Sequence, residues 1–260
     1  MNYPIYQVDA FTSELFKGNP AAVVPLKEWL PDDVMQKLAV ENNLSETAFI
    51  VPEGDRYRIR WFTPGTEVKL CGHATVASAH VLFNELNYDK ETIFFNSLSG
   101  ELRVKKTAEG KIQLDFPANP PEETDVPDGM FEGLGIEGKV FKTSFDYLVV
   151  VNSQKEVEQL TPDFKTLSKV KARGVIVSAK GGEVDFVSRC FYPQSGVDED
   201  PVTGSAHTIM IPYWAEQLGK TKMVARQLSK RGGELFCELK GDRALMEGFA
   251  VTYLKGEFYL

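Results

Sequence analysis

The chain has 260 residues, of which 43% are hydrophobic and 25% are charged, a composition typical of a folded globular protein rather than a disordered chain or a coiled coil. The formal net charge of −8 disfavours nucleic acid as a partner, because a phosphate backbone is bound by clustered Lys and Arg. No apolar run reaches the roughly 18 residues that a membrane helix needs, and residues 1–4 lack a signal-peptide pattern, so we expect a cytoplasmic protein without a membrane partner.

The first half of the chain predicts short strands and two helices. Two strands flank a Gly18-Asn19-Pro20 turn, and a helix opened by Pro31 and two acidic residues follows. A longer helix has apolar residues at helical spacing. The predicted strands are 5–8, 21–24, 44–51, 57–62, 92–95, 100–105 and 111–116, and the predicted helices are 34–40 and 75–86.

Residues 117–129 contain four prolines together with acidic residues and Gly129, which is typical of a linker. We therefore expect an N-terminal domain of residues 1–117 and a C-terminal domain of residues 118–260. The second half predicts strands at 147–151, 174–178, 184–191, 223–226, 234–239 and 248–253, with helices at 155–160 and 205–218. Mostly antiparallel strands around one long helix in each half predict an α+β fold.

Two segments of the chain have similar sequences. Residues 60–75 are RWFTPGTEVKLCGHAT and residues 189–207 are RCFYPQSGVDEDPVTGSAH, and a third match follows at Gly100 and Gly233. The spacing between matched positions is nearly constant along the chain. This predicts a duplicated domain, in which each half has a strand, a polar loop that ends at a glycine, and a helix. A pseudo-twofold axis would then relate the two halves.

The glycine at the end of each loop precedes a predicted helix. The first turn of a helix has unpaired backbone N–H groups and a partial positive charge, which suit a carboxylate or phosphate. The two helix starts are therefore candidate binding sites for a carboxylate or a phosphate. The alternative is that each glycine only allows a tight turn. The expected substrate-binding residues are Gly72, Ala74, Thr75, Gly204 and Ala206.

Glu46 is an acidic residue in a predicted strand that is otherwise mainly apolar. Alternation places its carboxylate on the same face as Leu44, Ala48 and Ile50. A carboxyl group in apolar surroundings holds its proton more readily, which suits a general acid/base. The alternative interpretation is that the opposite face of the strand points inward and that Glu46 lies in solvent.

His73, Asp200 and Ser205 lie in the two matched loops. His73 and Asp200 are candidates for moving or orienting protons, and Ser205 is a candidate for capping a helix or donating to a ligand. A His beside a glycine and an Asp before a proline are also common in ordinary turns. The prediction of a catalytic role therefore rests on their occurrence together in two matched loops.

Cys71 and Thr203 occupy the same position in the two loops. A cofactor-independent racemase needs an acid/base group on each face of its substrate, and a thiol in each loop would supply both. Because the Thr203 hydroxyl is too weak a base, we interpret Cys71 as a buried, apolar residue. With Cys190 and Cys237 the chain has three cysteines without metal-ligand spacing, which predicts a reducing compartment and no metal site.

These motifs together resemble those of the PhzF family, the phenazine-biosynthesis isomerase-like proteins, within the diaminopimelate epimerase fold. The resemblance covers nearly the whole chain. Its motifs are residues 7–11, 18–21, 44–49, 62–64 with 67–68 and 71–75, 199–206 and 231–233. The chain departs from the family at residues 227–228, which are Gln-Leu where relatives often have Gln-Gly.

The resemblance implies two similar domains, each with a mixed, barrel-like sheet around a central helix, and an active site in the cleft between them. It also implies a homodimer and no metal or organic cofactor. Glu46 resembles the catalytic acid/base of the family, and His73, Asp200 and Ser205 match its other active-site positions. The family reaction moves a proton on a cyclic dihydro-hydroxyanthranilate.

We therefore expect an isomerase that uses Glu46 to move a proton between carbons of a small carboxylate. Two alternatives stay open at this point. One is an amino-acid epimerase, a racemase or a hydroxyproline-type dehydratase that uses Cys71 as its base. The other is a non-catalytic protein that binds a metabolite.

Overall fold

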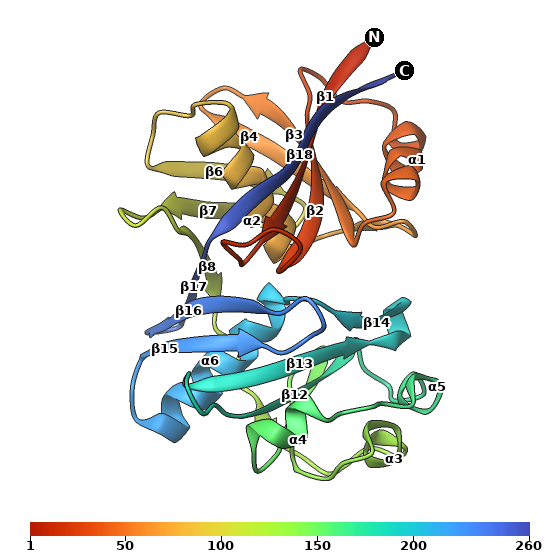
Figure 1. Ribbon diagram of the computed structural model, residues 1–260, viewed down its shortest axis with the longest axis vertical. Coiled ribbons are helices and arrows are strands. Elements are labelled where there is room, and N and C mark those ends of the chain that lie inside the picture. Colours follow the sequence, from red (N-terminus) through yellow and green to blue (C-terminus); the bar gives the residue numbers. More distant parts are fainter. The chain divides into compact units, whose positions relative to one another are not determined.

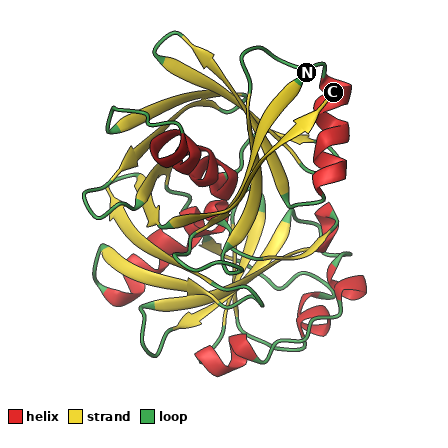
Figure 2. Ribbon diagram, turned by 45° about the horizontal axis from the view of Figure 1, so that its top comes forward, coloured by secondary structure: helices red, strands yellow, loops and turns green.

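The computed structural model describes residues 1–260, and the chain forms two compact units. Unit 1 comprises Met1–Asp115 and Glu247–Leu260, and unit 2 comprises Phe116–Met246. Strands predominate in both units (Figure 2), which confirms the expected α+β class. None of the helices has the length and hydrophobicity required to span a membrane.

The end of the chain belongs to a different unit than the sequence predicts. The expected C-terminal domain of residues 118–260 is too long, because strand β18, Ala250–Tyr259, lies in unit 1. There β18 pairs antiparallel with β1, Asn2–Ala10, along nearly its whole length. The pairing satisfies the backbone hydrogen-bonding groups along one edge of β1, so the last strand completes the sheet that the first strand begins. Figure 1 shows the two strands and both termini side by side.

Unit 1 contains the sheet that carries Glu46. Besides β1 and β18, its strands are β2 Asn19–Pro25, β3 Glu46–Glu53, β4 Arg56–Phe62, β5 Glu67–Val68, β6 Thr92–Ser97, β7 Gly100–Lys106 and β8 Ile112–Pro117. Its helices are α1 Asp32–Asn42 and α2 Gly72–His80, and α2 continues into a π-helical turn, Val81–Glu85. Strand β3 begins at Glu46 and runs parallel to β2, with Ala21 opposite Glu46.

Helix α2 is buried on all its faces rather than along one stripe. Every residue from His73 to His80 is buried, and the helix packs against β1, β2 and β3. Most of these residues are Ala, Ser or Thr, whose small side chains let the strands approach the helix closely. A helix enclosed by strands needs no polar face. The apolar stripe that the sequence shows is therefore only part of the buried surface of α2.

Unit 2 contains the second copy of the loop motif. Its strands are β9 Glu122–Glu123, β10 Lys139–Lys142, β11 Asp146–Val150, β12 Gly174–Lys180, β13 Phe186–Tyr192, β14 Val197–Asp200, β15 Lys222–Gln227, β16 Gly233–Lys240 and β17 Arg243–Gly248. Its helices are α3 Met130–Leu134, α4 Gln154–Glu158, α5 Phe164–Leu167 and α6 Gly204–Leu218, with a 3₁₀ turn at Pro193–Ser195. Helices α3, α4 and α5 contribute to a core with β11, β12 and β13.

The strand pairings of unit 2 follow the same order as those of unit 1. In unit 1, β2 is parallel to β3, β3 antiparallel to β4, β4 parallel to β6, and β6 antiparallel to β7. In unit 2, β11 is parallel to β12, β12 antiparallel to β13, β13 parallel to β15, and β15 antiparallel to β16. A buried helix follows a short strand in both units, α2 after β5 and α6 after β14. The two units therefore share one order of strand pairings.

A bidentate ion pair recurs in the loop of each unit. Arg60 donates from Nε and Nη2 to the Glu67 carboxylate, both at 2.7 Å. Arg189 donates in the same way to Glu199, at 2.7 and 2.8 Å. Each pair ties a long strand, β4 or β13, to the short strand that leads into the buried helix. The loops that lead into α2 and α6 are therefore held by the same kind of ion pair.

Candidate functional site

Glu46 and His73 meet in unit 1 at the start of β3 and the start of α2. Glu46 Oε2 lies 3.0 Å from His73 Nε2, and the two side chains are 17% and 5% exposed. The contact is close but poorly aligned for a hydrogen bond. Catalytic hydrogen bonds are often misaligned before substrate binds. The structure thus brings together two of the predicted catalytic residues and leaves part of the carboxylate open.

Asn19 and Cys71 approach the other nitrogen of the His73 ring. Asn19 Nδ2 lies 3.1 Å from Nδ1, and Cys71 Sγ lies 3.5 Å from it. These two contacts at Nδ1 fix the ring with Nε2 toward Glu46. Asn19 therefore positions the His73 ring, although the sequence predicts it only as part of a turn.

Burial and neighbouring charges set the protonation of this cluster. Burial raises the pKa of Cys71 to about 11, and Glu46 adds to the rise while His73 opposes it. Burial also disfavours a charged His73, but Cys71 and Glu46 outweigh it, so the pKa of His73 lies above its ordinary range. Because Cys71 keeps its proton near neutral pH, Glu46 is the group that stabilises the charged imidazolium there.

The geometry of the cluster does not favour a metal ion. Ligand atoms of Glu46, Cys71 and His73 lie within 4.8 Å of one another. However, the His73 ring presents Nδ1 to Cys71 and Nε2 to Glu46. A metal ion binds one ring nitrogen, so these three side chains would have to rearrange before they could share an ion. The arrangement is better suited to proton transfer.

Both buried helices begin at the predicted glycines. Helix α2 starts at Gly72 and α6 at Gly204, and neither N-cap side chain accepts a hydrogen bond from its helix. Thr75 donates from its N–H and its hydroxyl to Cys71 O, at 3.2 and 2.5 Å. Thr75 therefore closes the first turn of α2. The N–H groups that remain without an intrahelical partner belong to the residues before it.

The loop before α6 is held by Gln227. Thr203 Oγ1 donates to Asp200 Oδ2 at 2.5 Å, and Thr203 N donates to Gln227 Oε1 at 2.9 Å. Gln227 Nε2 in turn donates to the backbone oxygen of Asp200 at 2.6 Å. Gln227 is completely buried. The network fixes Asp200 relative to the start of α6, a role for Gln227 that no sequence spacing reveals.

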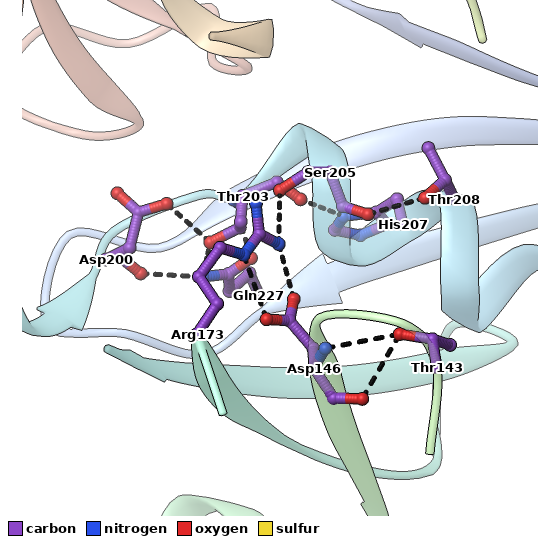
Figure 3. Close-up of polar contacts among 9 residues, drawn as sticks. All are labelled: Thr143, Asp146, Arg173, Asp200, Thr203, Ser205, His207, Thr208 and Gln227. Atoms are coloured by element: carbon purple, nitrogen blue, oxygen red, sulfur yellow. Dashed lines mark hydrogen bonds and ion pairs between the residues drawn. The ribbon is translucent and has the colours of Figure 1, made fainter. Parts of the chain in front are cut away.

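Ser205, on the first turn of α6, is bonded to an arginine. Arg173 Nη2 lies 3.0 Å from Ser205 Oγ, and Arg173 Nε donates to Asp146 Oδ1 at 2.9 Å. Figure 3 shows the Arg173 guanidinium between Ser205 and Asp146, with Thr143 bonded to the backbone of Asp146. Neither Arg173 nor Asp146 belongs to a recognisable motif, so the sequence alone does not mark them as functional residues.

Comparisons with known proteins match the whole chain. Residues 8–256 match the family model described as phenazine biosynthesis-like protein. The chain is 50% identical to an uncharacterised isomerase of Pseudomonas aeruginosa and 49% identical to one of Halalkalibacterium halodurans, each time over 100% of both chains. The human phenazine biosynthesis-like domain-containing protein is 41% identical over 98% of this chain and 99% of its own.

Solved structures show the same relationship. A PhzF family protein from Enterococcus faecalis has a TM-score of 0.97 at 49% identity, over 100% of both chains. A probable proline racemase from Agrobacterium radiobacter has a TM-score of 0.66 at 12% identity, over 99% of this chain and 92% of its own. The second match shows the fold alone, and it agrees with the epimerase-like architecture expected from the motifs.

Proposed function

The chain belongs to the PhzF family of phenazine biosynthesis-like proteins, and from this premise we propose that it moves a proton between two carbons of a small carboxylate, with Glu46 as the general acid/base. Full-length relatives at 50% and 49% identity are named isomerases, and this chain is an isomerase of the same family. The observation that supports a role for Glu46 is its 3.0 Å contact with His73 at the partly open start of β3.

The proton path uses groups of this cluster. The carboxylate of Glu46 accepts a proton from one carbon of the substrate, and the electron pair left behind is delocalised over the conjugated substrate. The carboxylic acid so formed returns the proton to another carbon, which balances atoms and electrons. His73, on the Oε2 side, orients the carboxylate and stabilises its negative charge.

The carboxylate group of the substrate needs a separate binding site. We expect first-turn N–H groups at Gly72 and Ala74 in α2, and at Gly204 and Ala206 in α6, to take part. That both helices bind the same substrate stays a prediction, as do the homodimer, the cytoplasmic location and a substrate of the dihydro-hydroxyanthranilate type. Asp200, fixed by Thr203, is proposed as a further proton-handling group.

Cys71 is the less favoured base. Its side chain is 6% exposed, and burial raises the pKa of its thiol to about 11, so little thiolate forms near neutral pH. An epimerase, racemase or dehydratase mechanism with Cys71 as the base is therefore not our proposal. A Cys71→Ala variant is expected to keep its activity.

The test is exchange of carbon-bound hydrogen in deuterated water. Small cyclic and unsaturated carboxylates would be incubated with the protein, and deuterium incorporation followed by NMR and mass spectrometry. We expect Glu46→Gln to slow the exchange by about 10²- to 10⁴-fold, the usual contribution of a general acid/base. Glu53→Gln, at the exposed far end of the same strand, is the matched control. Exchange at the wild-type rate in Glu46→Gln would exclude the assignment.

A further inference from the structure

The first residues of β3 and β12 occupy equivalent positions in the two units. Phe62 and Phe191 are matched in the sequence repeat, and each lies opposite the second residue of its neighbouring strand, β3 or β12. The first residues of these strands are Glu46 and Gly174. The position of the acid/base in unit 1 is therefore a glycine in unit 2.

Gly174 has no room for a side chain. A Cβ atom there would clash with the ring of Tyr192 and would lie 2.7 Å from the backbone oxygen of Phe191. Tyr192 is 7% exposed, so its ring is a fixed part of the core. Unit 2 consequently has no acid/base at the position equivalent to Glu46. Instead, Arg173, the residue before Gly174, contacts Ser205 at the start of α6.

Arg173 is held in one orientation from several sides. Its Nε donates to Asp146 Oδ1 at 2.9 Å, its Nη2 contacts Asp146 Oδ2, and Nη2 also lies 3.0 Å from Ser205 Oγ. The guanidinium carbon lies 4.5 Å from the centroid of the Phe145 ring and 5.4 Å from that of Tyr192. A guanidinium held in this way presents hydrogen-bond donors along a planar edge. It loses little conformational entropy when it binds a ligand.

The charges around Arg173 favour an anion. Helix α6 has 15 residues, and the partial positive charge at its start makes a neighbouring cation unfavourable. Asp146 is fully buried and balances Arg173 on one edge only, while the Arg173 side chain is 39% exposed. The Nη1 atom of Arg173 makes no hydrogen bond within the protein. The partly exposed Arg173 guanidinium and the start of α6, both positive, thus meet at the partly exposed Ser205 in a protein of net charge −8.

We infer that Arg173 is a substrate-positioning residue, which binds the substrate's carboxylate group together with Ser205 and the first turn of α6. Assigning the anion to the substrate rests on the proposed function, whereas binding of carboxylates at Arg173 does not.

The first measurement is binding of benzoate and anthranilate, with benzamide and anthranilamide as uncharged counterparts, by calorimetry and NMR titration. We expect the wild-type protein to bind the carboxylates and not the amides. In the double variant Asp146→Asn/Arg173→Met, carboxylate affinity should fall by about 10- to 100-fold, as for loss of a charge-assisted hydrogen bond. The double variant removes both charges, because Arg173→Met alone would leave a buried carboxylate unpaired.

Two further variants separate charge from geometry. Arg173→Lys keeps the charge and loses the planar edge, so its affinity should lie between those of the wild type and the double variant. Arg226→Met is the matched control, because Arg226 is also in unit 2, is 43% exposed and pairs with acidic residues. Wild-type protein that binds no carboxylate at millimolar concentration, or a double variant that binds as the wild type does, would overturn the inference.

Glu46→Gln distinguishes this inference from the proposed function. It should bind the carboxylates as the wild type does and yet lose hydrogen exchange. If Glu46→Gln still exchanges while the Arg173 variants lose binding, the proposed function fails and the anion site stands. If Glu46→Gln abolishes exchange while the Arg173 variants keep the wild-type KM, the anion site fails. A raised KM with little change in kcat in Arg173→Lys is the expected kinetic result.

Discussion

Two buried histidines of this protein are held without charge. His80 Nδ1 accepts from Asn84 Nδ2 at 2.9 Å, and its Nε2 lies 3.0 Å from Thr252 Oγ1. His207 Nδ1 lies 2.7 Å from Thr203 O. Burial lowers the pKa of both histidines to about 4. Both rings are therefore neutral across the range in which a histidine of the unfolded chain gains its proton.

The protein should consequently lose stability in mild acid. An unfolded histidine has a pKa of about 6.5, so between pH 6.5 and 4 the unfolded chain binds more protons than the folded one. Stability then falls with falling pH, by about 2–4 kcal/mol for each of His80 and His207. Urea unfolding at pH 7, 5.5 and 4.5 would measure this, and His80→Gln should weaken the dependence.

His73 makes a contribution of the opposite sign and serves as the comparison. Its pKa is raised in the folded protein, so its stabilising effect is complete below about pH 6.5 and is lost as pH rises through the folded value. A His73→Gln variant should accordingly keep the acid sensitivity. The same slope in the wild type and in His80→Gln would contradict the assignment to His80.

At the scale of elements, the sequence predicts the loops of the repeat better than the orientation of the strand that bears Glu46. The starts of α2 and α6 follow from the glycines and polar residues before them. The face of Glu46 does not follow from alternation, because Thr47 and Phe49 are buried as well as Ala48 and Ile50. Contact with His73, made only after folding, decides the environment of Glu46.

Short strands and isolated residues account for what the sequence does not predict. Strands β5 and β14, with two and four residues, are too short to show a period, although they carry Glu67 and Glu199 of the recurring ion pairs. Arg173 precedes a strand and belongs to no spacing rule. Its orientation is set by its ion pair with Asp146, which is 27 positions earlier in the chain and fully buried.

The crowding at the start of β12 is testable on its own. Gly174→Ala should destabilise unit 2 by about 1–3 kcal/mol, because the added methyl group forces the Tyr192 ring or the backbone to move. Thermal and urea unfolding would measure the loss, with Gly182→Ala as the control, where the new methyl group meets only the end of the Gln154 side chain at 3.7 Å.

A second substitution identifies the cause of that loss. Tyr192→Leu should recover part of the stability in the Gly174→Ala background, since it removes the ring. Recovery should stay incomplete, because the backbone oxygen of Phe191 remains 2.7 Å from the added atom. Equal stability of Gly174→Ala and the wild type would show that unit 2 has space for an acid at this position after all.

At the scale of the whole molecule, unit 2 is inserted between two segments of unit 1. The N-terminal nitrogen of Met1 donates to Leu260 O at 2.5 Å, and Leu260 N donates to Met1 O at 3.1 Å. The two ends of the chain can therefore be joined by a short flexible linker without disturbing β1 or β18. Such a joint would make unit 1 a continuous segment.

A permutant tests this organisation. A chain that runs from residue 247 to 260, through a Gly-Ser linker, and on from residue 1 to 115 should fold cooperatively, as judged by circular dichroism and by dispersed NMR signals. Residues 1–115 alone should not, because the edge of β1 would lack β18. A folded 1–115 segment of the same stability as the permutant would refute the role assigned to β18.

The pairing of β1 with β18 also orders events during synthesis of the chain. Strand β1 stays without its partner until residues 250–259 have been made, whereas residues 116–246 form unit 2 from one continuous segment. Unit 1 therefore depends on two segments that are far apart in the sequence, and unit 2 does not. The sheet around Glu46 and His73 is complete only when residues 250–259 have paired with β1, so a chain that stops before them leaves one edge of that sheet without its neighbouring strand.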